Sequence, residues 1–198
     1  MLFIRHRVNS PDEWVRLAPG LGAEVDLRSR GDVIVLNHEA FEDGPSFESF
    51  LATWASGPRR GPLILNPKED GLEKRAAAMC AAHGIDDWFF LDLSLPTMVR
   101  LSVKEGCRNV AVRVSEYESV EAAMRFAGLA DWAWVDSFCG EPPDLVTLRV
   151  LAARFRVCLV SPELEGHPLG RIDDWRHLAN EVHAVCTKRP EAWGWIEE

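Results

Sequence analysis

Several features that mark other classes of protein are missing from this sequence. No apolar run approaches the roughly 18 residues needed to cross a bilayer, and the first residues lack the basic and apolar regions of a signal peptide. The five cysteines are scattered, odd in number and without a C-x-x-C pair. Cys158 and Cys186 lie in apolar runs, so we expect buried, reduced thiols. We therefore expect a cytoplasmic protein with no transmembrane segment.

Basic residues are also scarce. The chain has 22 Lys and Arg against 31 Asp and Glu, a net charge of −9. Phosphate contacts need a basic surface, so this balance disfavours nucleic acid as a partner and argues against adsorption to anionic membranes. The hydrophobic fraction of 47% and the eight Trp indicate a folded globular protein. A small-molecule partner fits this composition better.

No strand-like run is followed by G-x-G-x-x-G or a P-loop, and no linker or low-complexity segment divides the chain. We expect a single domain over residues 1–198. Short apolar runs recur about every 25 residues and alternate with helical patterns, which predicts a parallel sheet covered by helices. Eight such units favour a compact (β/α)₈ barrel; an open doubly wound sheet is the alternative. The runs are Leu2–Ile4, Ala23–Leu27 with Val33–Leu36, Leu63–Leu65, Trp88–Leu91, Val110–Val114, Trp132–Val135, Val157–Val160 and Ala184–Cys186.

Capping residues and glycine stops place the helices between these runs. Ser10 precedes Pro11 at the start of the first helix, and Ser46 opens a helix with aromatic and apolar residues at helical spacing. Further helices are expected at Asp70–His83, Leu95–Lys104, Ser119–Ala127, Asp144–Phe155 and Asp173–Val182.

The stretch from Ala23 to Glu39 carries a pair of carboxylates. Glu24 and Asp26 are two residues apart, so in a strand both project from the same face. Burying two like charges together is costly, and a hard divalent cation offsets that cost. A turn at Ser29–Asp32 leads into a second run that ends at His38. Taken alone, such a pair is more often a solvated or salt-bridged strand end than a metal site.

In a βα barrel, chemistry gathers at the carboxyl ends of the strands. Polar residues follow the apolar runs at each of these positions. Histidines, carboxylates, an amide and a lysine are concentrated in the first three units, namely His6, Arg7, Glu24, Asp26, His38, Asn66 and Lys68.

This set resembles the glycerophosphodiester phosphodiesterases and the wider phospholipase-C-like phosphodiesterase barrels. The likeness lies in His6-Arg7, Glu24-Val25-Asp26, His38-Glu39, Asn66-Pro67-Lys68 and Thr187-Lys188-Arg189-Pro190. It implies a metal-dependent phosphoric diester hydrolase acting on a small or lipid-derived glycerophosphodiester. It also implies that Glu24, Asp26 and Asn66 hold a divalent cation, Mg²⁺ or Ca²⁺.

The resemblance also implies roles for the basic residues. Arg7 and Lys68 would offset charge that develops in the transition state. His6 and His38 would be the acid–base pair, one on each side of the phosphorus. A neighbouring substrate hydroxyl could attack first and give a cyclic phosphate, which water would open or which would leave as product.

Polar residues at the other strand ends would line the opposite wall and set specificity. These expected substrate-binding residues are Asp92, Arg113, Asp136, Ser161 and Glu163.

The chain departs from the family pattern in five places. The usual Pro-Glu-Asn-Thr segment is reduced to the remnant Pro11-Asp12-Glu13. Val8 stands where glycine is usual, Glu39 where aspartate is usual, and Asn66 where the third metal ligand is an acid. The usual inserted subdomain is reduced to about Phe41–Ser46. An amide oxygen still ligates Mg²⁺ or Ca²⁺ but carries no charge, which weakens the expected affinity.

These departures keep two other functions open. The first is a catalytically degenerate barrel that acts as a metabolite-binding or regulatory module. The second is a scaffold or assembly subunit that uses the Trp-rich tail around Trp193 and Trp195, with a homodimer as one form of assembly.

Overall fold

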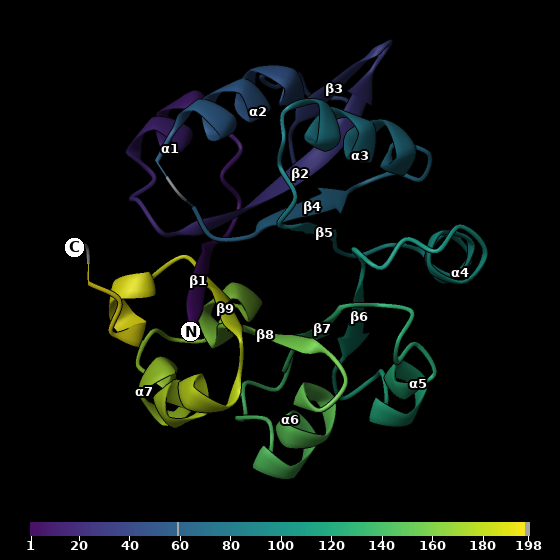
Figure 1. The fold of residues 1–198 in the computed structure, drawn as a ribbon. Coiled ribbons are helices and arrows are strands. Elements are labelled where there is room, and N and C mark those ends of the chain that lie inside the picture. The colour runs from purple at the N-terminus through teal and green to yellow at the C-terminus, as the bar shows by residue number, and fades with distance from the viewer. Residues whose placement is uncertain (59, 197–198) are drawn as a thin grey trace.

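The computed structural model describes residues 1–58 and 60–196. In this part of the chain, eight parallel strands curve into a barrel with helices on its outside, as predicted (Figure 1). The parallel strands are β1 (Leu2–Arg5), β2 (Gly22–Arg30), β4 (Leu63–Pro67), β5 (Trp88–Phe90), β6 (Ala111–Val114), β7 (Trp132–Val135), β8 (Arg156–Val160) and β9 (Ala184–Thr187). The open doubly wound sheet is therefore excluded.

The ladder of the sheet runs in the order β5-β4-β2-β1-β9-β8-β7-β6. The barrel closes between β5 and β6 through a single bridge, Phe90 to Val110. There the Phe90 N–H donates to the Asn109 carbonyl over 2.8 Å. This junction is much weaker than the continuous ladders elsewhere, and it leaves a seam in the wall.

The second predicted unit is a strand with a hairpin partner. Beyond its pairing with β4, β2 continues and pairs antiparallel with β3 (Val33–Leu36). The strand extends through Arg30, so the turn consists of Gly31 and Asp32 and is tighter than the predicted four-residue turn. Gly31 takes a φ of 56° there, which glycine adopts without strain.

Seven α-helices lie in the described residues, and five of them start as predicted. Four are capped by a side chain that accepts a hydrogen bond from the backbone N–H three residues ahead, namely that of Ser10, Ser46, Ser119 or Asp144, and a fifth begins at Leu95. The helices are α1 (Pro11–Arg16), α2 (Phe47–Ser56), α3 (Glu73–Ala82), α4 (Leu95–Val99, continued by a π-helical turn, Arg100–Lys104), α5 (Val120–Met124), α6 (Leu145–Ala152) and α7 (Arg171–Trp175). None of them is long and apolar enough to span a membrane.

The last predicted helix is wrong in its limits. Asp173 lies inside α7 rather than at its cap, and the chain continues from Arg176 to Glu181 as a 3₁₀ helix. Burial determines the conformation of this segment. Trp175 and Leu178 are fully buried against the barrel, and their spacing of three residues suits a 3₁₀ turn.

The core has two layers. The larger layer lies between the strands and the helices, and it includes Trp14 and Phe50, whose rings meet edge to face. The smaller layer fills the barrel itself. At its base Phe89 stacks on Trp132 with ring centroids 4.4 Å apart, over the small side chain of Ala111 on the strand between them.

This stacked pair gives a test of the barrel interior. Phe89 is fully buried, so Phe89→Ala leaves a cavity and should lower the free energy of unfolding by about 3–5 kcal/mol. Urea denaturation measures the change. Val15 is 77% exposed, and Val15→Ala should stay within about 0.5 kcal/mol of the parent. Equal effects of the two substitutions would contradict the packing described.

Candidate active site

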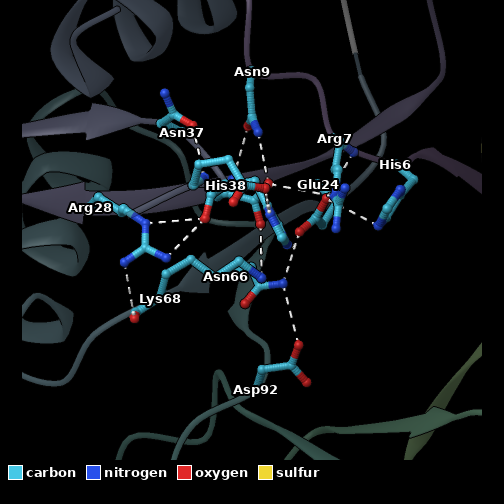
Figure 2. Close-up of polar contacts among 12 residues, drawn as sticks. His6, Arg7, Asn9, Glu24, Arg28, Asn37, His38, Asn66, Lys68 and Asp92 are labelled. Atoms are coloured by element: carbon cyan, nitrogen blue, oxygen red, sulfur yellow. Dashed lines mark hydrogen bonds and ion pairs between the residues drawn. The ribbon is translucent and has the colours of Figure 1, made fainter. Parts of the chain in front are cut away.

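A layer of polar side chains lies above the apolar filling of the barrel, at the carboxyl ends of the strands. Asp26 on β2 is in register with Asn66 on β4, and Glu24 is in register with Ile64 of the inner core. Residues in register on neighbouring strands share a face. Glu24, Asp26 and Asn66 therefore all point into the barrel, as the alternation along β2 predicts. Figure 2 shows Glu24 and Asn66 pointing toward each other.

Glu24 is fully buried and is held by neutral donors. Its Oε2 accepts the backbone N–H of Arg7 over 2.8 Å, and its Oε1 accepts Nδ2 of Asn66 over 3.0 Å. The nearest imidazole nitrogen, Nε2 of His6, is 3.8 Å away. Burial, and then the charge of Asp26, raise the pKa of Glu24 to about 7.

Asp26 is equally buried but is balanced by a cation. Its Oδ1 lies 2.9 Å from Nζ of Lys68, and its Oδ2 accepts Nδ2 of Asn9 over 2.7 Å. The Arg7 guanidinium is 3.9 Å away. Asn9 also accepts the backbone N–H of Asp26 over 3.0 Å, so one amide side chain fixes both the carboxylate and its strand.

Asn9 and Arg28 were not among the predicted site residues. Asn9 lies in a loop, where no periodicity marks it. Arg28 follows Asp26 on the same face of β2, a spacing of two that could have revealed it. Its guanidinium donates to the His38 carbonyl over 2.9 and 3.1 Å and to the Lys68 carbonyl over 3.5 Å. It thereby joins the loops that carry two predicted site residues (Figure 2).

Asn66 bridges the two sides of the site. Its Nδ2 donates to Glu24 and also to Oδ2 of Asp92 over 3.3 Å, while its buried Oδ1 has no hydrogen-bond partner. Oxygen and nitrogen of an amide can exchange places by a flip of the side chain. A flip would turn the unpartnered oxygen toward Glu24 and Asp92.

Arg113 connects Asp92 to the far wall. Its guanidinium pairs with Asp92 and contacts Oδ2 of Asp136 over 2.5 Å. Burial raises the pKa of Asp136 to about 7, against the opposing effect of Arg113. Three of the predicted substrate-binding residues therefore form one cluster across the β5–β6 seam.

Two non-glycine residues with positive φ border this layer. Arg7 has a φ of 54° and Asp92 a φ of 56°, a region that costs side-chain-bearing residues about 1 kcal/mol or more. The turn at Arg7 aims its N–H at Glu24. It also lets Val8, in the usual glycine position, pack into the outer core.

The two predicted acid–base histidines lie in different surroundings. His6 is mostly buried, and burial followed by the charge of Arg7 lowers its pKa to about 3, so it is neutral at ordinary pH. Its Nδ1 is buried without a partner. His38 is more exposed, and its Nδ1 lies 2.7 Å from Glu39 rather than from the buried carboxylates.

Ser161 and Glu163 are engaged at the ends of β8 and β9. The fully buried Ser161 hydroxyl accepts Nε1 of Trp193 over 2.7 Å and donates to Glu163. Glu163 also accepts the Thr187 hydroxyl over 2.5 Å and the Lys188 N–H over 3.0 Å. These hydrogen bonds connect the segments that follow β8 and β9. The contact of Ser161 and Glu163 with substrate stays a prediction.

Three oxygen-bearing side chains meet at this point of the site. No cluster of three His, Cys, Asp or Glu side chains suited to a metal occurs among the described residues. The carboxylates of Glu24 and Asp92 both face Nδ2 of Asn66, and a flip of that amide would place its unpartnered oxygen beside them. Hard cations bind such oxygens, so the flipped donor set would fit Mg²⁺ or Ca²⁺ with two charged ligands and one neutral ligand.

Comparison with known proteins shows the fold. No protein-family model and no curated protein matches the chain. A candidate glycerophosphodiester phosphodiesterase from Galdieria sulphuraria superposes with a TM-score of 0.74 at 13% identity, over 98% of this chain and 96% of that one. A phosphodiesterase from Oleispira antarctica, solved with its product sn-glycerol-3-phosphate, gives 0.63 at 15%, over 98% and 95%.

A phospholipase C shares the fold at a lower TM-score. A Ca²⁺-dependent phosphatidylinositol-specific phospholipase C from Streptomyces antibioticus superposes with a TM-score of 0.55 at 11% identity, over 98% of this chain and 96% of that one. Over nearly its full length, the chain therefore shares the barrel fold of these three solved proteins.

The raised pKa of Glu24 predicts how stability changes with pH. The folded protein holds this proton up to pH about 7, whereas an unfolded chain releases it near its ordinary value. Folding therefore favours the protonated form, and this contribution is lost as pH rises from about 4.5 to 7. Glu24→Gln should gain stability relative to the parent over that range, by up to about 3 kcal/mol.

Urea denaturation of both proteins at pH 5 and pH 8 measures the difference. Asp136, whose pKa is also raised, is present in both proteins, so its contribution to the pH dependence cancels in the difference between them. The exposed Glu42 provides the matched control, because Glu42→Gln should follow the parent at both pH values. A constant difference between Glu24→Gln and the parent would show that Glu24 is ionised in the folded protein throughout.

Proposed function

We propose that this protein is a divalent-cation-assisted phosphodiesterase that acts on a glycerophosphodiester-type substrate. The observation that carries the proposal is the polar layer at the mouth of the barrel. In it the cations Arg7 and Lys68 and the neutral imidazole of His6 surround the buried carboxylates Glu24 and Asp26. The fold shared with known phosphodiesterases supports the same activity.

The cation would be held by Glu24, by the flipped amide oxygen of Asn66 and by Oδ2 of Asp92, which the flip would free. Oδ1 of Asp92 would stay paired with Arg113. Asp26 already has Lys68 and Asn9 on its two oxygens. Asp26, the ligand expected from the sequence, could join only if Lys68 moved. A bound cation would neutralise a phosphate oxygen and would lower the pKa of Glu24 toward its ordinary value. Calcium or magnesium both suit oxygen ligands.

The basic groups would then carry the reaction. Arg7 and Lys68 would lie against the phosphate and stabilise the charge that grows on its oxygens. One histidine would take the proton of the attacking hydroxyl as the new P–O bond forms. The other would give a proton to the departing alcohol oxygen as the old bond breaks. His6 is neutral and its Nδ1 has no partner, so it would be the base. The negative charge of a bound phosphate would raise its low pKa and so make it a better proton acceptor. His38 would be the acid.

The identity of the attacking group sets the product. Attack by a hydroxyl on the substrate itself gives a cyclic phosphate, and attack by water on that ring then gives a phosphomonoester. Asp92, Arg113 and Asp136 would face the departing arm of the diester. A cytoplasmic location and a homodimer remain predictions.

A second function is favoured by the pairing of Asp26 and the loss of an acid at position 66. Here the barrel would bind a phosphorylated metabolite through Arg7 and Lys68 without cleaving it. The electrostatics support binding equally in both cases, so the two functions differ only in turnover and in cation affinity.

Turnover is tested by removing the buried imidazole. His6→Ala should reduce the hydrolysis of glycerophosphocholine by about 100-fold or more, the usual contribution of a general acid or base. His177 is exposed and remote from the layer, and His177→Ala should keep parental kcat/KM. Parental rates in His6→Ala, or no turnover by the parent, would exclude the proposed catalysis and leave the binding function.

Cation affinity is tested by calorimetric titration with Ca²⁺. Glu24→Gln should weaken binding at least tenfold, and Asn66→Asp, which adds a ligand charge, should strengthen it. Glu42→Gln is the matched control for a change in overall charge. Affinity should rise between pH 5 and pH 8 as Glu24 loses its proton. A Ca²⁺ affinity that neither substitution changes would show that the cation binds elsewhere.

A further inference from the structure

The seam in the barrel wall opens into a cavity. Beyond the single bridge from Phe90 to Val110, no ladder joins β5 to β6. Helices α4 and α5, which follow these two strands, lie on the same side of the barrel and flank the junction (Figure 1). Residues of β6, of both helices and of the segment 91–93 that follows β5 line a cavity of about 700 Å³, here called the seam cavity.

The wall of the seam cavity is largely apolar. Aliphatic, thioether and aromatic side chains from α4, α5 and the strand ends provide most of it, including Leu91, Met98, Ala122, Ala123 and Phe126. Such a wall stabilises an apolar ligand group by removing it from water. It offers few partners for the hydroxyls of a sugar or the edges of a base.

The mouth of the seam cavity carries exposed apolar side chains. Leu95 is 61% exposed, Tyr117 84% and Phe138 38%, and the Tyr117 and Phe138 rings lie 5.8 Å apart. All three follow the carboxyl ends of β5, β6 and β7, on the same face of the barrel as the candidate active site. Large exposed apolar groups gathered around a cavity mark a ligand or interaction site.

The seam cavity and the candidate active site share two residues. Asp92 and Arg113 line the cavity, and Asp92 also accepts Nδ2 of Asn66 in the polar layer. Asp92 and Arg113 pair with each other, so they present little net charge to a neutral group passing between the two spaces. A diester with its phosphorus near Arg7 and Lys68 could extend one arm past this pair into the cavity.

We propose that the seam cavity binds a single aliphatic chain of an amphipathic phosphodiester, while the phosphate occupies the polar layer. This inference rests on the proposed function and narrows its substrate class from glycerophosphodiesters in general to single-chain lipid phosphodiesters. The acidic side chain of Glu118 on the cavity wall disfavours a second anionic group there, which leaves the uncharged chain as the occupant.

Binding of an analogue tests the cavity without needing turnover. Alkylphosphocholines are phosphodiesters with one aliphatic chain, and they lack a hydroxyl that could attack the phosphorus. Calorimetric titration with the octyl, nonyl and decyl compounds, as monomers, should show about fourfold tighter binding for each added methylene. Affinity that is independent of chain length would overturn the proposal.

A blocking variant locates the chain. Ala122 is exposed on α5 yet lines the cavity, so Ala122→Trp fills the space from a position where folding tolerates bulk. It should abolish the dependence on chain length, and Ala122→Ser should retain it. Val146 is 72% exposed on α6, and Val146→Trp controls for the added tryptophan. Chain dependence that survives in Ala122→Trp would overturn the assignment to this cavity.

Turnover separates this inference from the proposed function. The parent should cleave a single-chain lysophosphatidylcholine with higher kcat/KM than glycerophosphocholine, and Ala122→Trp should lose that preference but keep its rate on glycerophosphocholine. Cleavage of glycerophosphocholine with no gain from a chain would overturn the cavity proposal and leave the phosphodiesterase function. Chain-dependent binding without any cleavage would support the cavity and refute the catalysis.

Discussion

Two carboxylates lie side by side inside an apolar barrel, and the arrangement of the site follows from their burial. Glu24 and Asp26 are fully buried, so each charge must be paired, hydrogen bonded or removed by protonation. The two buried carboxylates are stabilised in different ways. Lys68 and Asn9 engage Asp26, whereas Glu24 receives neutral donors and has its pKa raised to about 7.

This difference makes Glu24 the responsive member of the pair. A proton can balance its charge, and a divalent cation bound as proposed would do the same, so cation binding would release a proton from this one residue. The left-handed turn at Arg7 provides a backbone donor to it, and Asn66 connects it to Asp92. The strained backbone at Arg7 and Asp92 is therefore part of how the polar layer is built.

The barrel supports this layer from below and is interrupted at one side. Stacked aromatic rings of Phe89 and Trp132 fill the base, while the wall is weakly closed between β5 and β6. A short chain of 198 residues is close to the lower limit for a (β/α)₈ barrel. With little inserted sequence beside the candidate active site, the pocket next to it forms at the seam between β5 and β6 instead.

Local patterns in the sequence predict the barrel and the face on which the polar layer lies. Period-two alternation places Glu24 and Asp26 on one side of β2, and strand–helix repetition brings the strand ends together. Which groups meet there depends on the tertiary packing. Asn9 reaches Asp26, and Asp92 reaches Asn66, through turns whose left-handed backbone no periodicity encodes. Likewise, Asp173 fell inside α7 because burial of Trp175 and Leu178 outweighed local capping preference.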